Sequence, residues 1–194
     1  MKEVFLEIYR ERVKRPGAEK LLEWLESSDF FEAPASTRFH LCRPGGLVEH
    51  SVHVYERLRE LYSNELARNA SGPVILTDEE EETIAICGLL HDLCKVGYYK
   101  QEMRNVKVNG TWEQQPFYTV DEQFPYGHGE KSVFIAERFI RLTSEEAVAI
   151  RYHMGGFDAK PGDYSISKAY EMYPLGAMLH SADLLASYLD ETRG

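Results

Sequence analysis

Hydrophobic residues recur at spacings of three and four positions along most of the chain, a pattern typical of amphipathic helices. This periodicity predicts helices over residues 2–14, 17–27, 46–70, 77–95, 128–141, 143–153 and 174–191. Two of them begin with the pattern of a capping box, in which Thr77 precedes Glu80 and Thr143 precedes Glu146. We therefore expect an all-α fold.

Three stretches interrupt the helical pattern. Residues 27–46 are irregular and end in a proline–glycine break. Residues 97–127 carry an Asn109–Gly110 turn between two β-prone runs, which predicts a small β-hairpin inserted into the helical domain. Residues 154–173 show no helical pattern and are predicted to form a loop.

The composition fits one ordinary globular domain, because 43% of the 194 residues are hydrophobic and 28% are charged. We expect a single domain over residues 1–194, in which residues 1–43 supply helices and a loop that pack on the core. No apolar run approaches the roughly 20 residues that cross a bilayer. The N-terminal segment mixes charged and apolar residues, unlike a signal peptide. These features predict a cytoplasmic protein with no membrane partner.

The formal net charge of -10 at pH 7 argues against a long nucleic acid as partner, because such binding is driven by basic surfaces. If the protein handles phosphates, bound metal ions must supply much of the local positive charge. The cysteines Cys42, Cys87 and Cys94 form no CxxC pair and no disulfide framework. We interpret Cys87 and Cys94 as small core residues rather than catalytic thiols.

Five predicted helices each place a histidine or an aspartate on their apolar face. The residues concerned are His50, His91 with Asp92, His128, His153 and Asp183. One such residue alone is usually a hydrogen-bonded core group, but burying this many costs several kcal/mol each unless they are paired or bind metal. Four imidazoles and two carboxylates suit Fe, Mn, Ni, Co or Zn. Since six ligands exceed one tetrahedral site, we expect two ions that share a bridging carboxylate.

The motifs around these residues resemble, in order, those of the HD superfamily of metal-dependent phosphohydrolases. They read GGLVEHSVHV, LLHDLCKVG, GHGEKS, IRYHMGG and LHSADLLAS, within about residues 44–190. The resemblance implies an HD-domain helical bundle and the ligand order of the dinuclear members. It implies His50, His91, Asp92 and Asp183 as ligands of the first metal. Asp92 would bridge to a second metal, which His128 and His153 complete.

Lys95 matches the lysine of the HDxxK motif, which in the family faces the substrate phosphate. The resemblance therefore implies Asp92 and Lys95 as catalytic residues, although Lys95 could instead be a helix-end lysine that extends to solvent. Two features depart from the family pattern. Some dinuclear relatives have two adjacent histidines where this chain has Tyr152–His153, and the GYP signature of cyclic-di-GMP phosphodiesterases is absent, which argues against that activity.

Other residues have weaker signals. His53 and His180 lie one turn from His50 and Asp183 and could orient those ligands, although a plain structural role is favoured for both. Arg38 and His40, in the segment before the first ligand helix, could reach the substrate from the rim of the site. The insertion at 97–127 is expected either to overhang the site, where its aromatic residues could stack on a base, or to cover the core as a surface flap. Its candidate residues are Tyr98, Tyr99, Lys100, Arg104, Lys107 and Trp112.

The resemblance implies hydrolysis of a phosphate ester or anhydride in a small, nucleotide-like substrate. IRYHMGG is similar to small HD enzymes that cleave dinucleoside tetraphosphates, and LLHDLCKVG and LHSADLLAS are similar to the HD domain of bacterial 3′→5′ exoribonucleases. Those exoribonucleases also contain an OB-fold, for which this chain has no room. Two alternatives remain: a di-iron oxygenase of the HD fold, and a non-catalytic module that binds metal, a nucleotide or a partner. The sequence does not indicate an oligomeric state.

Overall fold

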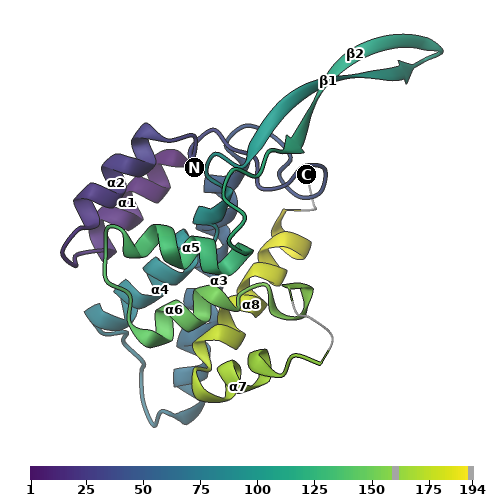
Figure 1. Cartoon of the computed structure of the whole chain (residues 1–194). Coiled ribbons are helices and arrows are strands. Elements are labelled where there is room, and N and C mark those ends of the chain that lie inside the picture. The colour runs from purple at the N-terminus through teal and green to yellow at the C-terminus, as the bar shows by residue number, and fades with distance from the viewer. Residues whose placement is uncertain (159–161, 192–194) are drawn as a thin grey trace.

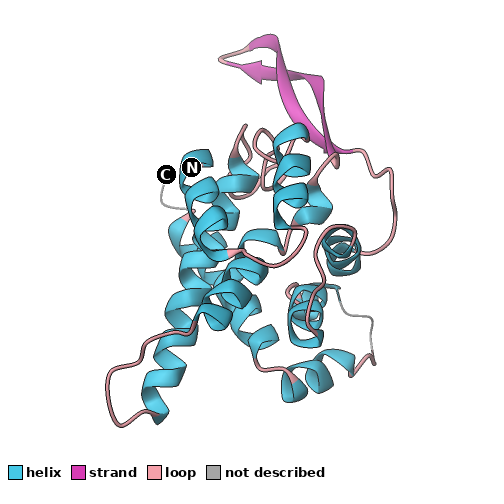
Figure 2. Cartoon of the chain, turned by 90° about the vertical axis from the view of Figure 1, so that its left-hand side faces the viewer, coloured by secondary structure: helices cyan, strands magenta, loops and turns pink. Residues whose placement is uncertain are grey.

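The long helix α3 (Gly46–Asn69) packs against α1 (Lys2–Arg12), α4 (Asp78–Leu90) and α8 (Leu175–Leu185) in a computed structural model that describes residues 1–158 and 162–191. Figures 1 and 2 show these helices forming one bundle, from which a two-stranded β-ribbon projects. The bundle also contains α2 (Ala18–Ser27), α5 (His128–Glu137), α6 (Ser144–Arg151) and α7 (Ser165–Met172). The predicted architecture, a helical domain with one small hairpin, is confirmed. None of the helices in the described part of the chain is long and apolar enough to cross a membrane.

Both predicted capping boxes are present. The hydroxyl of Thr77 accepts the backbone N–H of Glu80 at 3.3 Å, and Glu80 accepts the backbone N–H of Thr77 at 2.8 Å. The same reciprocal bonds join Thr143 and Glu146 at the start of α6. Each box satisfies two backbone groups that a helix terminus otherwise leaves without partners. The starts of α4 and α6 are thus determined locally, by residues three positions apart.

The predicted continuation of the fourth helix to Lys95 is wrong. Helix α4 ends at Leu90, and the chain tightens into a short 3-10 turn, η1 (Leu93–Lys95). The backbone N–H of Cys94 donates to the hydroxyl of Ser132 on α5 at 3.0 Å instead of to a carbonyl within its own helix. A tertiary hydrogen bond therefore ends the helix, and hydrophobic periodicity carries no signal for it.

The predicted loop over residues 154–173 is also wrong in part. It contains a short 3-10 turn, η2 (Gly155–Asp158), and helix α7, while its residues 159–161 lie outside the described part of the chain, as do residues 192–194 of the predicted domain. Helix α7 has no side-chain cap at its start, so the capping signal that marks α4 and α6 is missing here. The hydroxyl of Tyr170 donates to the carbonyl of Tyr152 at 2.8 Å and ties α7 to the end of α6. Helix α5 also ends earlier than predicted, at Glu137, because the next turn is tightened to 3-10 type.

The inserted hairpin lies within the predicted segment 97–127. Strands β1 (Tyr99–Val108) and β2 (Thr111–Val120) pair antiparallel around the Asn109–Gly110 turn, in which both residues have positive φ, as a tight hairpin turn requires. Most of its side chains are exposed, and the ribbon extends away from the helices (Figures 1 and 2). At its base, Asp121 N–H donates to the carbonyl of Tyr98 at 2.8 Å, so the two ends of the insertion lie together.

Candidate metal centre

The carboxylate of Asp92 lies at the centre of the histidine cluster, at the turn that follows α4. Its Oδ1 is 2.9 Å from Nε2 of His128 on α5 and 3.6 Å from Nε2 of His153, just after α6. Its Oδ2 is 3.5 Å from Nε2 of His91 and 3.6 Å from Nε2 of His50 on α3. The two oxygens of one carboxylate therefore face two different pairs of histidines.

Asp183, on α8, completes the group from the other side. Its Oδ1 is 3.3 Å from Nε2 of His50, which in turn is 3.2 Å from Nε2 of His91. Among the described residues, three overlapping sets of three possible donors contain the six candidates: His50, His91 and Asp183; His91, Asp92 and His153; and Asp92, Cys94 and His128. A fourth set, at the edge of the cluster, joins His40, His50 and Glu191. The structure thus brings together all six residues for which the sequence predicts metal ligation; their role as ligands stays a prediction.

Two of the histidines are oriented by backbone carbonyls. Nδ1 of His91 donates to the carbonyl of Gly88 at 2.9 Å, and Nδ1 of His153 donates to the carbonyl of Ile150 at 2.7 Å. A neutral imidazole with its proton on Nδ1 presents a lone pair at Nε2. Both Nε2 atoms accordingly point toward Asp92 as potential ligands.

The cluster fits a metal on chemical grounds as well as by proximity. Nε2 of His153 is completely buried and has no hydrogen-bond partner among the described residues, which is costly for a polar atom in a protein interior. His91 and Asp92 are also buried. Imidazole nitrogens with carboxylate oxygens are donors that suit divalent transition metals. The side chains that could hold such ions are those of His50, His91, Asp92, His128, His153 and Asp183.

In the absence of metal, protons occupy some of these positions. Burial disfavours a charge on His50, but the carboxylates of Asp183 and Glu191 outweigh burial and raise the pKa of His50 to about 10. For His128, Cys94 and Asp92 likewise outweigh burial and raise the pKa to about 9. Since a metal and a proton compete for the same nitrogen lone pair, metal binding here must release protons.

Lys95 lies inside the cluster rather than at its solvent edge. Its Nζ is 2.6 Å from Oδ2 of Asp92, and its side chain is only 11% exposed. Burial opposes the charge on both groups, yet the pair holds the pKa of Lys95 above its ordinary value and that of Asp92 well below. This geometry places a cation beside the candidate metal ligands and differs from the alternative of a lysine extended into solvent.

Cys94 makes contacts that differ from the predicted apolar packing. Its Sγ is 3.4 Å from Nδ1 of His128 and 3.9 Å from Oδ1 of Asp92, so the thiol belongs to the polar cluster. Cys87, in contrast, is fully buried in the apolar core as expected. The apolar stretch around Cys94 favours apolar packing, whereas its position two residues after Asp92 is the sequence signal for a polar environment.

Glu191 is the largest omission from the sequence analysis. Its side chain is fully buried and lies 3.0 Å from Nδ1 of His50, 3.1 Å from Nδ1 of His53 and 3.8 Å from Nε2 of His40. Burial opposes its charge, but His50 and His53 outweigh burial and lower the pKa of Glu191 to about 2. In a regular α-helix, Glu191 would lie about 80° around the axis from Asp183, so periodicity alone does not place both residues against the same ring.

The residues predicted to contact substrate lie at different depths. His40 is half-buried, and its ring centroid is 5.1 Å from that of His50, which places it at the edge of the cluster. Arg38 is exposed and stacks on Phe39, with its guanidinium carbon 5.3 Å from the ring centroid. His40 therefore reaches the cluster, whereas the Arg38 side chain lies on the outer surface of the loop.

The remaining two histidines differ in what they orient. His53 shares Glu191 with His50 and so contacts a partner of a candidate ligand. Nδ1 of His180 donates to the backbone carbonyl of His153 at 2.6 Å and supports the chain there rather than the imidazole ring. His180 thus has the structural role favoured for it.

Only the base of the inserted ribbon approaches the helices. The hydroxyl of Tyr99 donates to the carbonyl of Ala35 at 3.3 Å, and the ring of Tyr98 lies 5.3 Å from Nζ of Lys131. Trp112 is 67% exposed and lies near the turn. The ribbon neither folds over the cluster nor covers the core, because its outer part extends away from the bundle (Figure 1). Among the candidate residues of the insertion, Lys100 near the base and Arg104, Lys107 and Trp112 farther out are all exposed.

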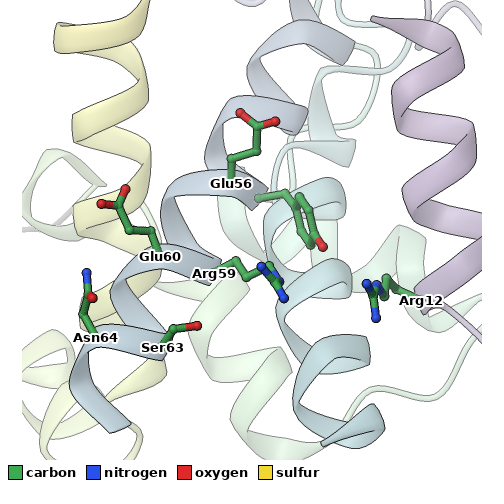
Figure 3. Close-up of a pocket in the computed structure, with 7 residues that line it drawn as sticks. Arg12, Glu56, Arg59, Glu60, Ser63 and Asn64 are labelled. Carbon is green, nitrogen blue, oxygen red and sulfur yellow. The ribbon is translucent and has the colours of Figure 1, made fainter. Parts of the chain in front are cut away.

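A second polar feature lies farther along α3. Figure 3 shows a surface groove in which Arg12 from α1 faces Arg59, with Glu56, Glu60, Ser63 and Asn64 nearby. Nε of Arg59 donates to both carboxylate oxygens of the buried Glu81, at 2.9 and 3.0 Å, and Nη2 of Arg59 donates to Oε1 at 2.5 Å. None of the six candidate ligands lines this groove. It is an ion-paired surface and not the chemical centre of the molecule.

Comparison with known proteins identifies the region that carries the cluster. A family model described as HD domain matches residues 47–192, a span that includes all six candidate ligands, Lys95 and Glu191. Searches among the curated proteins and among the solved structures gave no significant match.

Proposed function

This chain belongs to the HD domain family, and we propose that it is a metal-dependent phosphohydrolase that cleaves a small, nucleotide-like phosphate ester or anhydride. Members of this family are generally metal-dependent phosphohydrolases, and this chain has a His/Asp cluster that could hold divalent ions. The observation that carries the proposal is the position of Asp92. One carboxylate contacts His50 and His91 through one oxygen and His128 and His153 through the other, which is the arrangement expected of a bridging ligand.

We assign His50, His91, Asp92 and Asp183 to one metal and Asp92, His128 and His153 to the other. Divalent ions bound there would lower the pKa of a water so that hydroxide is available near neutral pH, and would offset charge on the reacting phosphate. The backbone carbonyls of Gly88 and Ile150 keep the proton of His91 and His153 on Nδ1, which leaves Nε2 free as a donor. The chain thus contributes an oriented set of ligands.

The role proposed for Lys95 is to bind a phosphate oxygen of the substrate. Its ammonium is held beside Asp92 and stays cationic at neutral pH because the carboxylate raises its pKa against the effect of burial. A fixed cation stabilises negative charge that develops on the phosphate during in-line attack. His40, at the edge of the cluster, and Arg38, on the same loop, are proposed to contact the substrate outside its phosphate.

The substrate is proposed to be small because the net charge of -10 disfavours long polyanions. Binding of a compact phosphate needs only local positive charge, which Lys95 and the metals supply. A nucleotide or a short oligonucleotide end satisfies this requirement.

The test is a screen of protein loaded with Mn²⁺, Co²⁺ or Ni²⁺ against nucleoside monophosphates, dinucleoside polyphosphates and a generic phosphodiester. We expect release of phosphate or nucleotide, about two ions bound per chain, and loss of turnover in Asp92→Ala. Asp121→Ala is the matched control, since Asp121 is a half-exposed aspartate that pairs with Lys100 at the base of the ribbon. Full turnover in Asp92→Ala would refute the proposal, as would oxygen consumption in place of hydrolysis.

A further inference from the structure

We propose that Glu191 is a positioning residue for the metal centre: its carboxylate holds the proton of His50 on Nδ1 and so turns Nε2 of His50 toward the metal. The inference deepens the proposed function, on which it rests for the identity of His50 as a ligand. Glu191 contacts Nδ1 of His50, whereas Asp183 and His91 lie near Nε2 of the same ring. It acts through the imidazole of His50.

The contact with Glu191 determines which ring nitrogen of His50 carries the hydrogen. Both oxygens of Glu191 lie near Nδ1 of His50, at 3.0 and 3.2 Å, and the carboxylate is fully buried. An ionised carboxylate can only accept hydrogen bonds, so Nδ1 must carry the hydrogen. With the hydrogen on Nδ1, Nε2 of His50 is the atom available to a metal, and it already faces His91 and Asp183.

The position of His50 in its helix explains why a carboxylate is needed. His91 caps the end of α4 and His153 follows α6, so each can donate to a carbonyl in a last helical turn, where carbonyls lack regular partners. His50, in contrast, is the fifth residue of the 24-residue helix α3, whose neighbouring carbonyls are engaged within the helix. An acceptor for its Nδ1 must therefore come from another part of the chain.

The end of α8 is shaped to deliver that acceptor. After Leu185 the chain widens into a π-helical turn, η3 (Ala186–Asp190), which Glu191 closes by donating its backbone N–H to the carbonyl of Ala186 at 3.1 Å. In a regular α-helix, residues eight apart differ by roughly 80° around the axis. The wider turn lets Asp183 and Glu191 contact the same imidazole, one at Nε2 and the other at Nδ1. Single π turns inside helices occur frequently at functional sites.

His53 secures Glu191 in this position. Its Nδ1 lies 3.1 Å from Oε1 of Glu191, one turn along α3 from His50. The carboxylate thus bridges two histidines of the same helix and has little freedom to rotate. Partners of this kind fix the ring orientation of a metal-bound histidine, and their loss lowers metal affinity by about 10–100-fold.

The experiment titrates Co²⁺ and Mn²⁺ into metal-free wild-type, Glu191→Ala and Glu191→Gln proteins and records the visible spectrum of the cobalt forms. The matched control is Asp190→Asn, which changes the neighbouring acidic residue, whose carboxylate pairs with Arg57 at the surface. We expect Glu191→Ala to weaken metal binding by about 10–100-fold and to alter the cobalt spectrum. Glu191→Gln should recover part of the affinity, because its amide oxygen can still accept from His50, and Asp190→Asn should bind as wild type.

Equal metal affinity and an unchanged cobalt spectrum in Glu191→Ala would overturn the inference. So would equal losses in Glu191→Ala and Asp190→Asn, which would indicate a general effect of the chain end; thermal unfolding of the metal-free proteins checks the same point. The outcomes separate this inference from the proposed function. A protein that binds metal through Glu191-dependent His50 but hydrolyses no phosphoester refutes only the function, whereas hydrolysis with Glu191-independent metal binding refutes only the positioning role.

Discussion

Nζ of Lys95 lies 2.6 Å from Oδ2 of Asp92, the same oxygen that faces His50 and His91. A protein cation and the candidate metal ligands therefore share one carboxylate. The turn that ends α4 produces this proximity, because it brings residues three apart onto one side of a tight 3-10 segment. The relationship makes Lys95 the most direct target for a kinetic test.

Lys95→Met should lower kcat/KM by about 10²–10³-fold, because it removes one fixed charge that stabilises the reacting phosphate. Metal content should be retained, since Lys95 is a cation and not a ligand. Steady-state kinetics together with metal analysis measure both effects. Lys168→Met, at an exposed lysine on α7, is the control and should leave kcat/KM unchanged. A Lys95→Met protein with wild-type kcat/KM would exclude the phosphate role.

Gly88→Ala should lower both the stability of the fold and its affinity for metal. A Cβ at Gly88 would lie 2.5 Å from Cα of Tyr55, so α4 and α3 would have to move apart, at a cost of about 1–3 kcal/mol. His91, which is bonded to the Gly88 carbonyl, would move away from His50. Urea unfolding and a metal titration test the two effects. Gly156→Ala is the control, because a Cβ there meets no atom within 4 Å; a similar loss in both variants would contradict the packing argument.

Arg15→Gln should be strongly destabilising. The guanidinium of Arg15 donates to both oxygens of Glu146, at 2.7 and 2.8 Å, and the Glu146 side chain is completely buried. Removing the cation leaves a buried carboxylate without its charged partner, which costs about 3–5 kcal/mol in unfolding free energy. Arg43→Gln breaks an exposed pair with Glu49 and should cost about 0–1 kcal/mol. Equal losses in the two variants by chemical denaturation would refute the role assigned to burial.

The Arg59–Glu81 pair beside the groove of Figure 3 should make stability depend on pH. Hydrogen bonds from Arg59 lower the pKa of Glu81 in the folded state. A folded-state pKa below the unfolded value stabilises the protein above the unfolded pKa of about 4.3, and this contribution is lost as pH falls through the folded-state value. Glu81→Gln should therefore cost about 1–2 kcal/mol at pH 7 and progressively less below pH about 4. Unfolding curves of both proteins across this pH range provide the measurement; a constant difference would contradict the linkage.

The sequence predicted the parts of the fold that depend on local chemistry. Capping boxes at Thr77 and Thr143 and the Asn109–Gly110 turn are made by residues close together in the chain, and all three are present. The C-terminal end of α4 depends instead on the tertiary hydrogen bond from Cys94 to Ser132, and α7 is held by the bond from Tyr170 to Tyr152. Periodicity does not report such bonds.

The same division holds at the candidate site. Each of the six predicted ligands lies on the apolar face of a predicted helix, so periodicity selects it. The structure brings all six together, although Asp92 and His153 lie just beyond the ends of α4 and α6. Periodicity does not select Glu191, because the π turn after Asp183 changes the angle between successive residues. The apolar stretch around Cys94 predicts apolar partners, but the chain has left the α-helix at this residue and its thiol contacts His128.

The ribbon of β1 and β2 leaves the bundle between the His91–Asp92 turn and His128, and its two ends meet at the bond between Tyr98 and Asp121. Because the two ends are held together at the base, the number of residues in the ribbon does not affect the positions of the candidate ligands that precede and follow it. A homologue could shorten, extend or replace this segment in a single insertion or deletion without altering the metal centre. The ribbon is therefore a position at which evolution can exchange one appendage for another while the chemistry is inherited unchanged.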